Sequence, residues 1–191
     1  MNEPWLTPFS DTSVPIWSNP TPNAGFYVPT EPDILVIPRH ATDLFYDVRT
    51  RAQWIDEYNA IYWKGSPSAS EHKFYETRRT YAEIVDRESD KLLFHLVSWD
   101  VDPLMFHQAN AGAYDGTHSL LTDLLDATFA KYVAVYRLPV RNLTMKQVGV
   151  RVADRMAYDR ASTFAVITPC TSMTLSVRRA ADIPLTGVVA G

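Results

Sequence analysis

The clearest helical pattern of apolar positions in the chain lies between residues 117 and 136. Apolar side chains recur there at spacings of three and four residues, which is the spacing of one face of an α-helix. The members of this stripe are Leu121, Leu125, Phe129, Tyr132, Val133 and Tyr136. Leu120 and Leu124 widen it beyond what a surface helix needs, and Thr117 or Ser119 can cap its start. The pattern therefore predicts a buried central helix.

Two helices are predicted ahead of this segment. The first is expected over residues 42–65, because the apolar side chains between residues 54 and 61 follow a helical spacing and a Gly-Ser-Pro break comes next. The second is expected from residue 68 to about residue 89. It opens with Ser68 and Glu71, which have the spacing of a capping box.

The pattern is less decisive beyond residue 90. Residues 92–101 fit a buried helix about as well as a strand, so both assignments stay open. An Asp-Pro pair predicts a short helix over residues 102–112. Thr144 and Gln147 form another capping box, which predicts a helix to residue 160 with apolar side chains on one face and arginines beside them.

The first 40 residues differ in kind from the rest, because they hold eight of the 13 prolines. Proline at this density disfavours both helices and sheet ladders. The segment also contains large aromatic side chains, which a disordered tail would lack. These are Trp5, Phe9, Trp17, Phe26 and Tyr27. We expect an extended arm whose aromatic residues contact either its own core or a neighbouring subunit, with a strand-like run at residues 34–37.

The end of the chain predicts a second appendage. Residues 164–167 and 173–177 are short runs typical of a small hairpin or an extended arm, and residues 183–191 are apolar and uncharged. The predicted fold class is therefore mainly α. It consists of a helical bundle core over residues 41–160, an extended proline- and aromatic-rich N-terminal arm over residues 1–40, and a short β or extended C-terminal segment over residues 161–191.

Composition adds a charge asymmetry to this picture. The chain is 46% hydrophobic and 21% charged, which is ordinary for a globular protein. Residues 1–130 carry nine basic and nineteen acidic side chains, whereas residues 131–191 carry nine basic and three acidic ones. The asymmetry indicates a bound polyanion, contacts between acidic and basic surfaces of neighbouring subunits, or a chance distribution over a folded surface.

The basic part contains two pairs of arginines at a spacing of four residues. Arg137 and Arg141 form one pair, and Arg151 and Arg155 form the other. Each pair can project from one helical face, and guanidinium groups suit phosphate oxygens. These four residues are the candidate nucleic-acid contacts, and the alternative is a solvated face with salt bridges to the acidic part.

No motif for a known reaction is found. Three histidines and three aspartates lie within 24 residues, but their spacing matches no known set of metal ligands or acid–base groups. They are His95, His107, His118, Asp100, Asp102 and Asp115. The chain has one cysteine and no glycine-rich phosphate loop. We therefore expect no catalytic residues, no metal site and no cofactor.

The overall layout resembles, at the level of organisation, a subunit of a viral or phage coat. A compact core with two arms and a basic surface is typical of such assemblies. The predicted function is therefore structural, with other copies or other subunits of the assembly as partners, and with nucleic acid as a further partner. No run reaches the ~20 apolar residues of a membrane span, and no signal peptide is found, so we expect cytoplasmic synthesis and a place in the virion. The alternatives are a small cytosolic enzyme with a site drawn from His95, His107 and His118, or a protein-binding adaptor.

Overall fold

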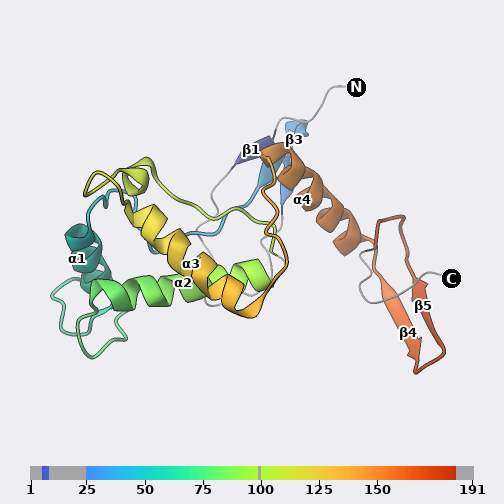
Figure 1. Cartoon of the computed structure of the whole chain (residues 1–191). Helices are drawn as coiled ribbons and strands as arrows, with labels where there is room; N and C mark the ends of the chain where they lie inside the picture. The colour runs from blue at the N-terminus through green and yellow to red at the C-terminus, as the bar shows by residue number, and fades with distance from the viewer. Residues whose placement is uncertain (1–5, 9–24, 99, 184–191) are drawn as a thin grey trace. The chain divides into compact units, whose positions relative to one another are not determined.

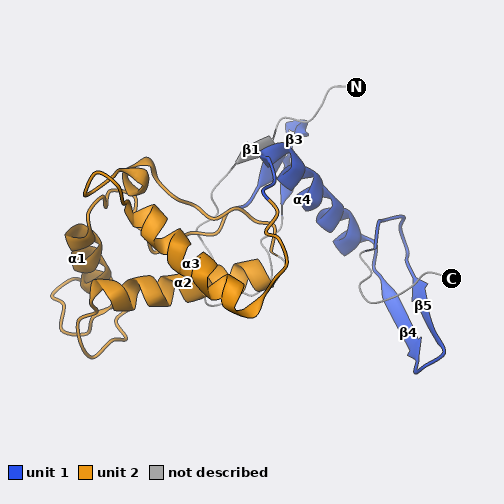
Figure 2. Cartoon of the chain, in the orientation of Figure 1, with its two compact units in different colours: residues 1–9, 23–38, 142–191 blue, residues 10–22, 39–141 orange. Residues whose placement is uncertain are grey.

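The computed structural model describes residues 6–8, 25–98 and 100–183 of the chain (Figure 1). The chain divides into two compact units, which Figure 2 distinguishes by colour. Unit 1 comprises residues 1–9, 23–38 and 142–191, and unit 2 comprises residues 10–22 and 39–141. Among the described residues, no helix combines the length and the apolar character needed to cross a membrane.

Unit 1 is built around a small sheet and one helix. Strand β3 (Glu31–Ile37) pairs in parallel with β1 (Leu6–Pro8) and antiparallel with β2 (Phe26–Val28). Helix α4 (Met145–Arg160) lies against β3. The buried side chains of this layer are Leu35, Val36, Ile37, Val148, Val152 and Met156. Gly25 lies under the helix with no room for a side chain, since a Cβ there would come within 2.5 Å of Val152 Cγ1.

A separate hairpin completes the described part of unit 1. Strands β4 (Phe164–Thr168) and β5 (Ser172–Ser176) pair antiparallel, which is the first of the two alternatives, a hairpin or an extended arm, that the sequence left open. Every residue of β4 is exposed.

Unit 2 is helical. It contains α1 (Arg51–Tyr62), α2 (Tyr81–Val97), a 3₁₀ turn η1 (Gln108–Ala111) and α3 (Leu120–Val135). Helices α2 and α3 pack along one another, and α1 packs on α2 (Figure 1). The buried core is formed by Leu44, Val48, Trp54, Tyr58, Ile84, Leu92, Leu120 and Leu124.

The predicted fold class is wrong, because the chain is mixed α/β and not a mainly α bundle. The error lies in the segment expected to be an arm. Residues 35–37 form the buried centre of a sheet, although Pro32 and Pro38 lie on either side. Proline removes a backbone N–H, but neither proline falls within the residues that pair on both sides, so the ladder loses no bond there.

Helix α1 begins nine residues later than the sequence pattern predicted. Its capping box is formed by Thr50 and Gln53, and Thr50 Oγ1 accepts a hydrogen bond from the backbone N–H of Gln53. The preceding segment is not helical, because its carbonyls are bonded elsewhere. Asn110 Nδ2 donates to the carbonyl oxygens of Phe45 and Val48 at 2.8 and 2.9 Å.

Helix α2 also begins later than predicted. The Ser68 box does not start a helix, and the box formed by Thr80 and Glu83 does. At its other end, α2 continues to Val97, so most of the ambiguous segment 92–101 is helical.

Helix α3 confirms the predicted helix but not its predicted burial. The fully buried residues are Leu120 and Leu124, which widen the predicted stripe, and Thr128, which lies outside it. Phe129 and Val133 of that stripe are exposed. Only the first half of α3 therefore contributes to the core of unit 2.

Candidate functional site

The buried face of α2 carries polar side chains along its second half. Ile84, Glu88, Lys91 and His95 follow one another at spacings of three and four residues, so they form one stripe. The stripe begins with an apolar residue and ends with His95, which is 7% exposed, in the last turn of the helix. Buried ionisable groups are rare unless they are paired or bind a ligand, so their partners identify the site.

A second histidine faces this end of α2 from a distant part of the sequence. His40 is held by backbone hydrogen bonds, since its N–H donates to Pro103 O at 2.9 Å and its carbonyl accepts from Met105 N at 2.8 Å. Its ring lies against the ring of His95, with centroids 4.2 Å apart. The two imidazoles are therefore brought together by packing between segments that lie far apart in the chain.

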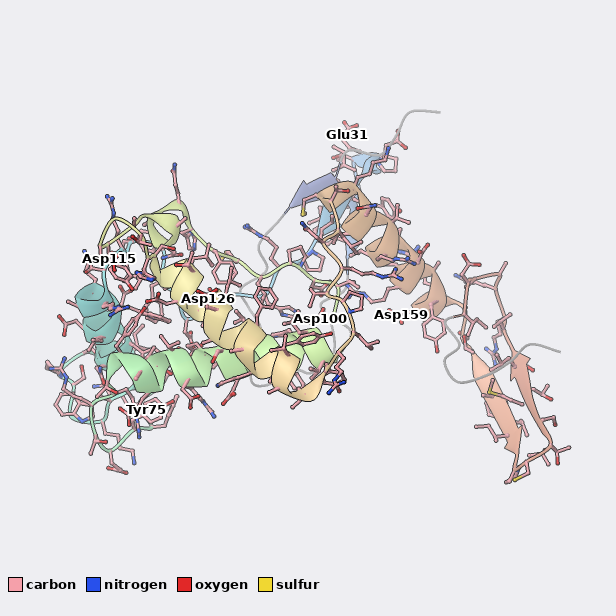
Figure 3. All side chains as sticks on the ribbon, in the orientation of Figure 1. Glu31, Tyr75, Asp100, Asp115, Asp126 and Asp159 are labelled. Atoms are coloured by element: carbon pink, nitrogen blue, oxygen red, sulfur yellow. The ribbon has the colours of Figure 1, made fainter. Side chains whose placement is uncertain are left out.

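Asp100 joins the two imidazoles. Its Oδ2 atom lies 2.6 Å from His40 Nε2 and 2.9 Å from His95 Nδ1. Its Oδ1 atom accepts a hydrogen bond of 2.9 Å from the backbone N–H of Asp102. Figure 3 shows Asp100 beside the C-terminal end of α2. We refer to His40, His95 and Asp100 as the histidine cluster.

The electrostatics of the cluster favour an ionised carboxylate. Burial alone would raise the pKa of Asp100, but the hydrogen bonds to His40, His95 and the Asp102 amide outweigh it and hold that pKa well below its usual range. The site therefore presents a negative charge between two imidazole rings. A buried negative charge beside two imidazole rings, whose nitrogens can act as metal ligands, favours the binding of a cation.

The donor set fits a divalent metal ion. One nitrogen from each imidazole and one oxygen of Asp100 lie within 4.8 Å of one another. Two histidines and one carboxylate are a common ligand set for catalytic zinc and for other transition metals. In addition, His95 Nε2 is buried without a hydrogen-bond partner among the described residues, which a buried nitrogen tolerates poorly unless something binds it.

A second carboxylate lies near the cluster. The side chain of Asp102 is fully buried, and its Oδ2 atom lies 3.9 Å from His40 Nε2. Asp102 precedes Pro103, whose carbonyl holds His40 in place. The site therefore combines a candidate metal-binding set with a second, buried carboxylate.

One turn earlier on α2 lies a buried ionic network. Lys91 Nζ contacts Asp43 Oδ2 and lies 2.7 Å from Glu88 Oε1. Tyr58 OH donates to Glu88 Oε1 at 2.9 Å, and Tyr62 OH donates to Asp43 Oδ1 at 2.7 Å. Burial and the charge of Asp43 raise the pKa of Glu88 to about 7, against the opposing effect of Lys91. We refer to these five residues as the ionic network.

Comparison with known proteins gives the family. The model of the Agd3 deacetylase domain matches residues 11–165, which is most of the chain. The chain belongs to the Agd3 deacetylase domain family. Membership of a deacetylase domain family points to an enzyme.

A solved structure agrees with this family in its fold. The chain is similar to the one described as "Crystal structure of Agd3 a novel carbohydrate deacetylase", with 19% sequence identity and a TM-score of 0.58. The similarity covers 81% of this chain but 24% of that protein. Among curated protein sequences, none matches the chain.

The predicted function of a capsid or coat protein is therefore wrong, as is the prediction that the chain is not an enzyme. The absence of a spaced catalytic motif misled the prediction, because the histidine cluster of this Agd3 family member is assembled from distant segments. The alternative hypothesis of an enzyme with a histidine and carboxylate site agrees better with the comparisons.

That alternative named only part of the cluster. His95 and Asp100 converge, but the partner histidine is His40, which the sequence analysis did not consider. His107 precedes η1, where its backbone N–H donates to the Asn110 side chain at 2.8 Å. His118 contacts Asp115 on the surface, and Figure 3 shows Asp115 on the far side of unit 2 from Asp100. Sequence spacing alone could suggest His95 with Asp100, but it gave no signal for His40.

The other predicted site residues remain predictions. Arg137 and Arg141 are exposed beyond the end of α3 in unit 2. Arg151 and Arg155 lie on α4 in unit 1, the first exposed and the second half-buried. Phe26 and Tyr27, predicted as subunit contacts, are exposed on β2. Trp5, Phe9 and Trp17 lie outside the described residues.

Proposed function

We propose that the chain carries a metal-dependent deacetylase site that removes acetyl groups from a carbohydrate. The single observation that carries the proposal is the histidine cluster, a His-His-Asp donor set buried in a member of a deacetylase domain family. The name of the solved relative supports carbohydrate as the substrate class. The chain spans 24% of that relative, so its activity is proposed here and not transferred.

The reaction would be a hydrolysis. Water adds to the acetyl carbonyl carbon, the bond from that carbon to the sugar nitrogen or oxygen breaks, and acetate leaves. The proton released by the water ends on the sugar amine or hydroxyl. A bound divalent cation would polarise the carbonyl and lower the pKa of the attacking water. The roles left for this chain are to hold that cation and to move the proton.

Each residue of the site then has a distinct role. His40, His95 and Asp100 would hold the cation through two nitrogens and one carboxylate oxygen. The Asp102 amide fixes Asp100 through its bond to Oδ1. The Asp102 carboxylate, close to His40, is the candidate proton acceptor for the attacking water.

The test combines metal binding with acetate release. Protein stripped with a chelator is titrated with Zn²⁺, and the loaded protein is incubated with oligosaccharides of N-acetylglucosamine and N-acetylgalactosamine and with an O-acetylated oligosaccharide. We expect zinc to bind and acetate to be released. Asp100→Asn and His95→Gln should reduce both zinc binding and acetate release to background, because each removes a proposed ligand.

His118→Gln is the matched control, since His118 pairs with an aspartate at the same 2.9 Å distance as His95 but on the surface. It should leave zinc binding and activity unchanged. Zinc binding that survives Asp100→Asn would show that the histidine cluster is not the metal site. Zinc bound at the cluster without acetate release from any of these substrates would disprove the deacetylase assignment.

A further inference from the structure

We infer that Lys91 and Asp43, in the ionic network, are positioning residues for the histidine cluster. Neither side chain belongs to the candidate metal-binding set. Their contact holds the segment that carries His40 against the helix that carries His95. The inference rests on the proposed function, because it assigns these residues a role in forming that site.

Both clusters are built from the same two stretches of chain. On α2, Lys91 and His95 lie four residues apart on the buried face, so one turn of helix separates them. On the segment after β3, His40 and Asp43 lie three residues apart. Each stretch contributes one group to each contact, since His40 meets His95 and Asp43 meets Lys91.

Further hydrogen bonds hold the His40 segment against residues 103–105. The backbone of His40 is bonded to Pro103 and Met105, and Thr42 Oγ1 donates to Met105 O at 2.7 Å. These bonds fix the segment against residues 103–105. The ion pair between Asp43 and Lys91 ties the same segment directly to the helix that carries His95.

Asp43 is itself held from several sides. Tyr62 OH donates to its Oδ1 atom at 2.7 Å, and Trp54 Nε1 donates to its carbonyl oxygen at 2.6 Å. Both donors lie on α1. Lys91 is fixed in turn by Glu88, at 2.7 Å. Both members of the pair therefore have further partners besides each other.

The buried charges make the position of the segment specific. A displacement of the segment along α2 would separate the buried Lys91 ammonium from the Asp43 carboxylate, whose side chain is 19% exposed, and breaking an ion pair with a buried member is unfavourable. An apolar contact at this position would allow such a displacement at a smaller cost. The pair therefore selects the arrangement in which the rings of His40 and His95 meet.

A purely stabilising network makes a different prediction. It would lower the stability of the fold when disrupted but leave the geometry of the histidine cluster unchanged in the molecules that remain folded. A positioning role also changes metal affinity in folded protein. Residues that orient metal ligands typically change affinity by about 10- to 100-fold when they are replaced.

The experiment measures the Kd for Zn²⁺ by competition with a chromophoric chelator, together with the absorption spectrum of the Co²⁺-loaded protein. The variants are Lys91→Met and Asp43→Asn. We expect the zinc Kd to rise by at least about 10-fold in Lys91→Met and by a smaller factor in Asp43→Asn, whose amide can still accept hydrogen bonds. The Co²⁺ spectrum should change in both. Asp43→Asn decides the question if Lys91→Met does not fold.

The matched control is Tyr58→Phe, which removes the hydrogen bond to Glu88 but leaves the contact between Asp43 and Lys91 in place. Its zinc Kd should stay within about twofold of the wild-type value, even though the fold is destabilised. An unchanged Kd in folded Lys91→Met or Asp43→Asn would overturn the inference and leave the proposed function standing. A wild-type protein that binds no zinc at the histidine cluster would overturn both.

Discussion

The ionic network and the histidine cluster occupy one buried face of α2, yet they differ in how their polar atoms are paired. In the ionic network, no side-chain nitrogen or oxygen of the described residues is buried without a partner. In the histidine cluster, His95 Nε2 is buried with none. The polar atoms of the ionic network are therefore paired with one another, whereas the histidine cluster has a nitrogen that can still bind a ligand.

This difference separates a structural role from a ligand-binding role. A buried polar atom without a partner costs about 1–3 kcal/mol, so a ligand that supplied a partner for His95 Nε2 would recover this cost. A complete network contributes little net stability compared with apolar packing, but it specifies which segments meet. Adjacent clusters on one helix can therefore serve the same site, one by binding and the other by positioning.

Removal of the Lys91 charge is expected to reduce the free energy of unfolding more than any other change considered for the two clusters. Lys91→Met leaves the buried Glu88 and the partly buried Asp43 together without a positive charge, and breaking a buried pair in this way costs about 3–5 kcal/mol. The measurement is urea unfolding at pH 7. Lys131→Met is the control, since Lys131 pairs with Asp86 and Asp90 near the surface and should cost about 1 kcal/mol or less. Equal losses of unfolding free energy in the two variants would show that the buried ion pairs of Lys91 contribute no more than the surface pairs of Lys131.

The pH dependence of stability gives an intermediate effect. The folded-state pKa of Glu88 is raised from 4.5 to about 7, so the folded protein binds this proton more tightly than the unfolded chain does. The resulting stability is fully present below about pH 4.5 and is lost as the pH rises through about 7. Glu88→Gln cannot titrate, so it should not show this loss.

Urea unfolding at intervals from pH 5 to pH 8 checks the sign. The free energy of unfolding should fall more steeply with rising pH in the wild type than in Glu88→Gln. The difference between the two curves isolates Glu88, because the two proteins share every other ionisable group. Parallel curves would mean that the pKa of Glu88 is close to its ordinary value and that the network is ionised throughout this range.

Local sequence patterns were sufficient for the elements that depend on near neighbours. The helix after Thr144, the helix after Ser119 and the hairpin from residue 164 all follow from spacing and capping residues. The starts of α1 and α2 were missed, because each region offers two capping signals. In α1 the choice is decided by Asn110, which lies far along the chain and takes the carbonyls of residues 45 and 48.

The sheet and the site depend on contacts that no local pattern encodes. Leu6 pairs with Leu35 in the parallel ladder, and His40 meets Asp100 across 60 positions of sequence. Only the pair of His95 and Asp100, five residues apart, lies within the reach of spacing arguments. Spacing alone groups that pair with His107 and His118, which the fold places elsewhere. The sequence therefore shows histidines and aspartates that can form a site, but it does not show which of them come together in the fold.

The smallest expected effect comes from the surface counterpart of the histidine cluster. His118 Nδ1 lies 2.9 Å from Asp115 Oδ2, the same separation as between His95 Nδ1 and Asp100 Oδ2. Both side chains of the surface pair are about half exposed, however, and water can solvate either charge. Hydrogen bonds from His118 and from the backbone lower the pKa of Asp115 to about 2. His118→Gln should leave the urea midpoint and the zinc Kd unchanged. A higher zinc Kd in this variant would mean that a histidine and an aspartate at this distance suffice for zinc binding, without burial and without a second imidazole.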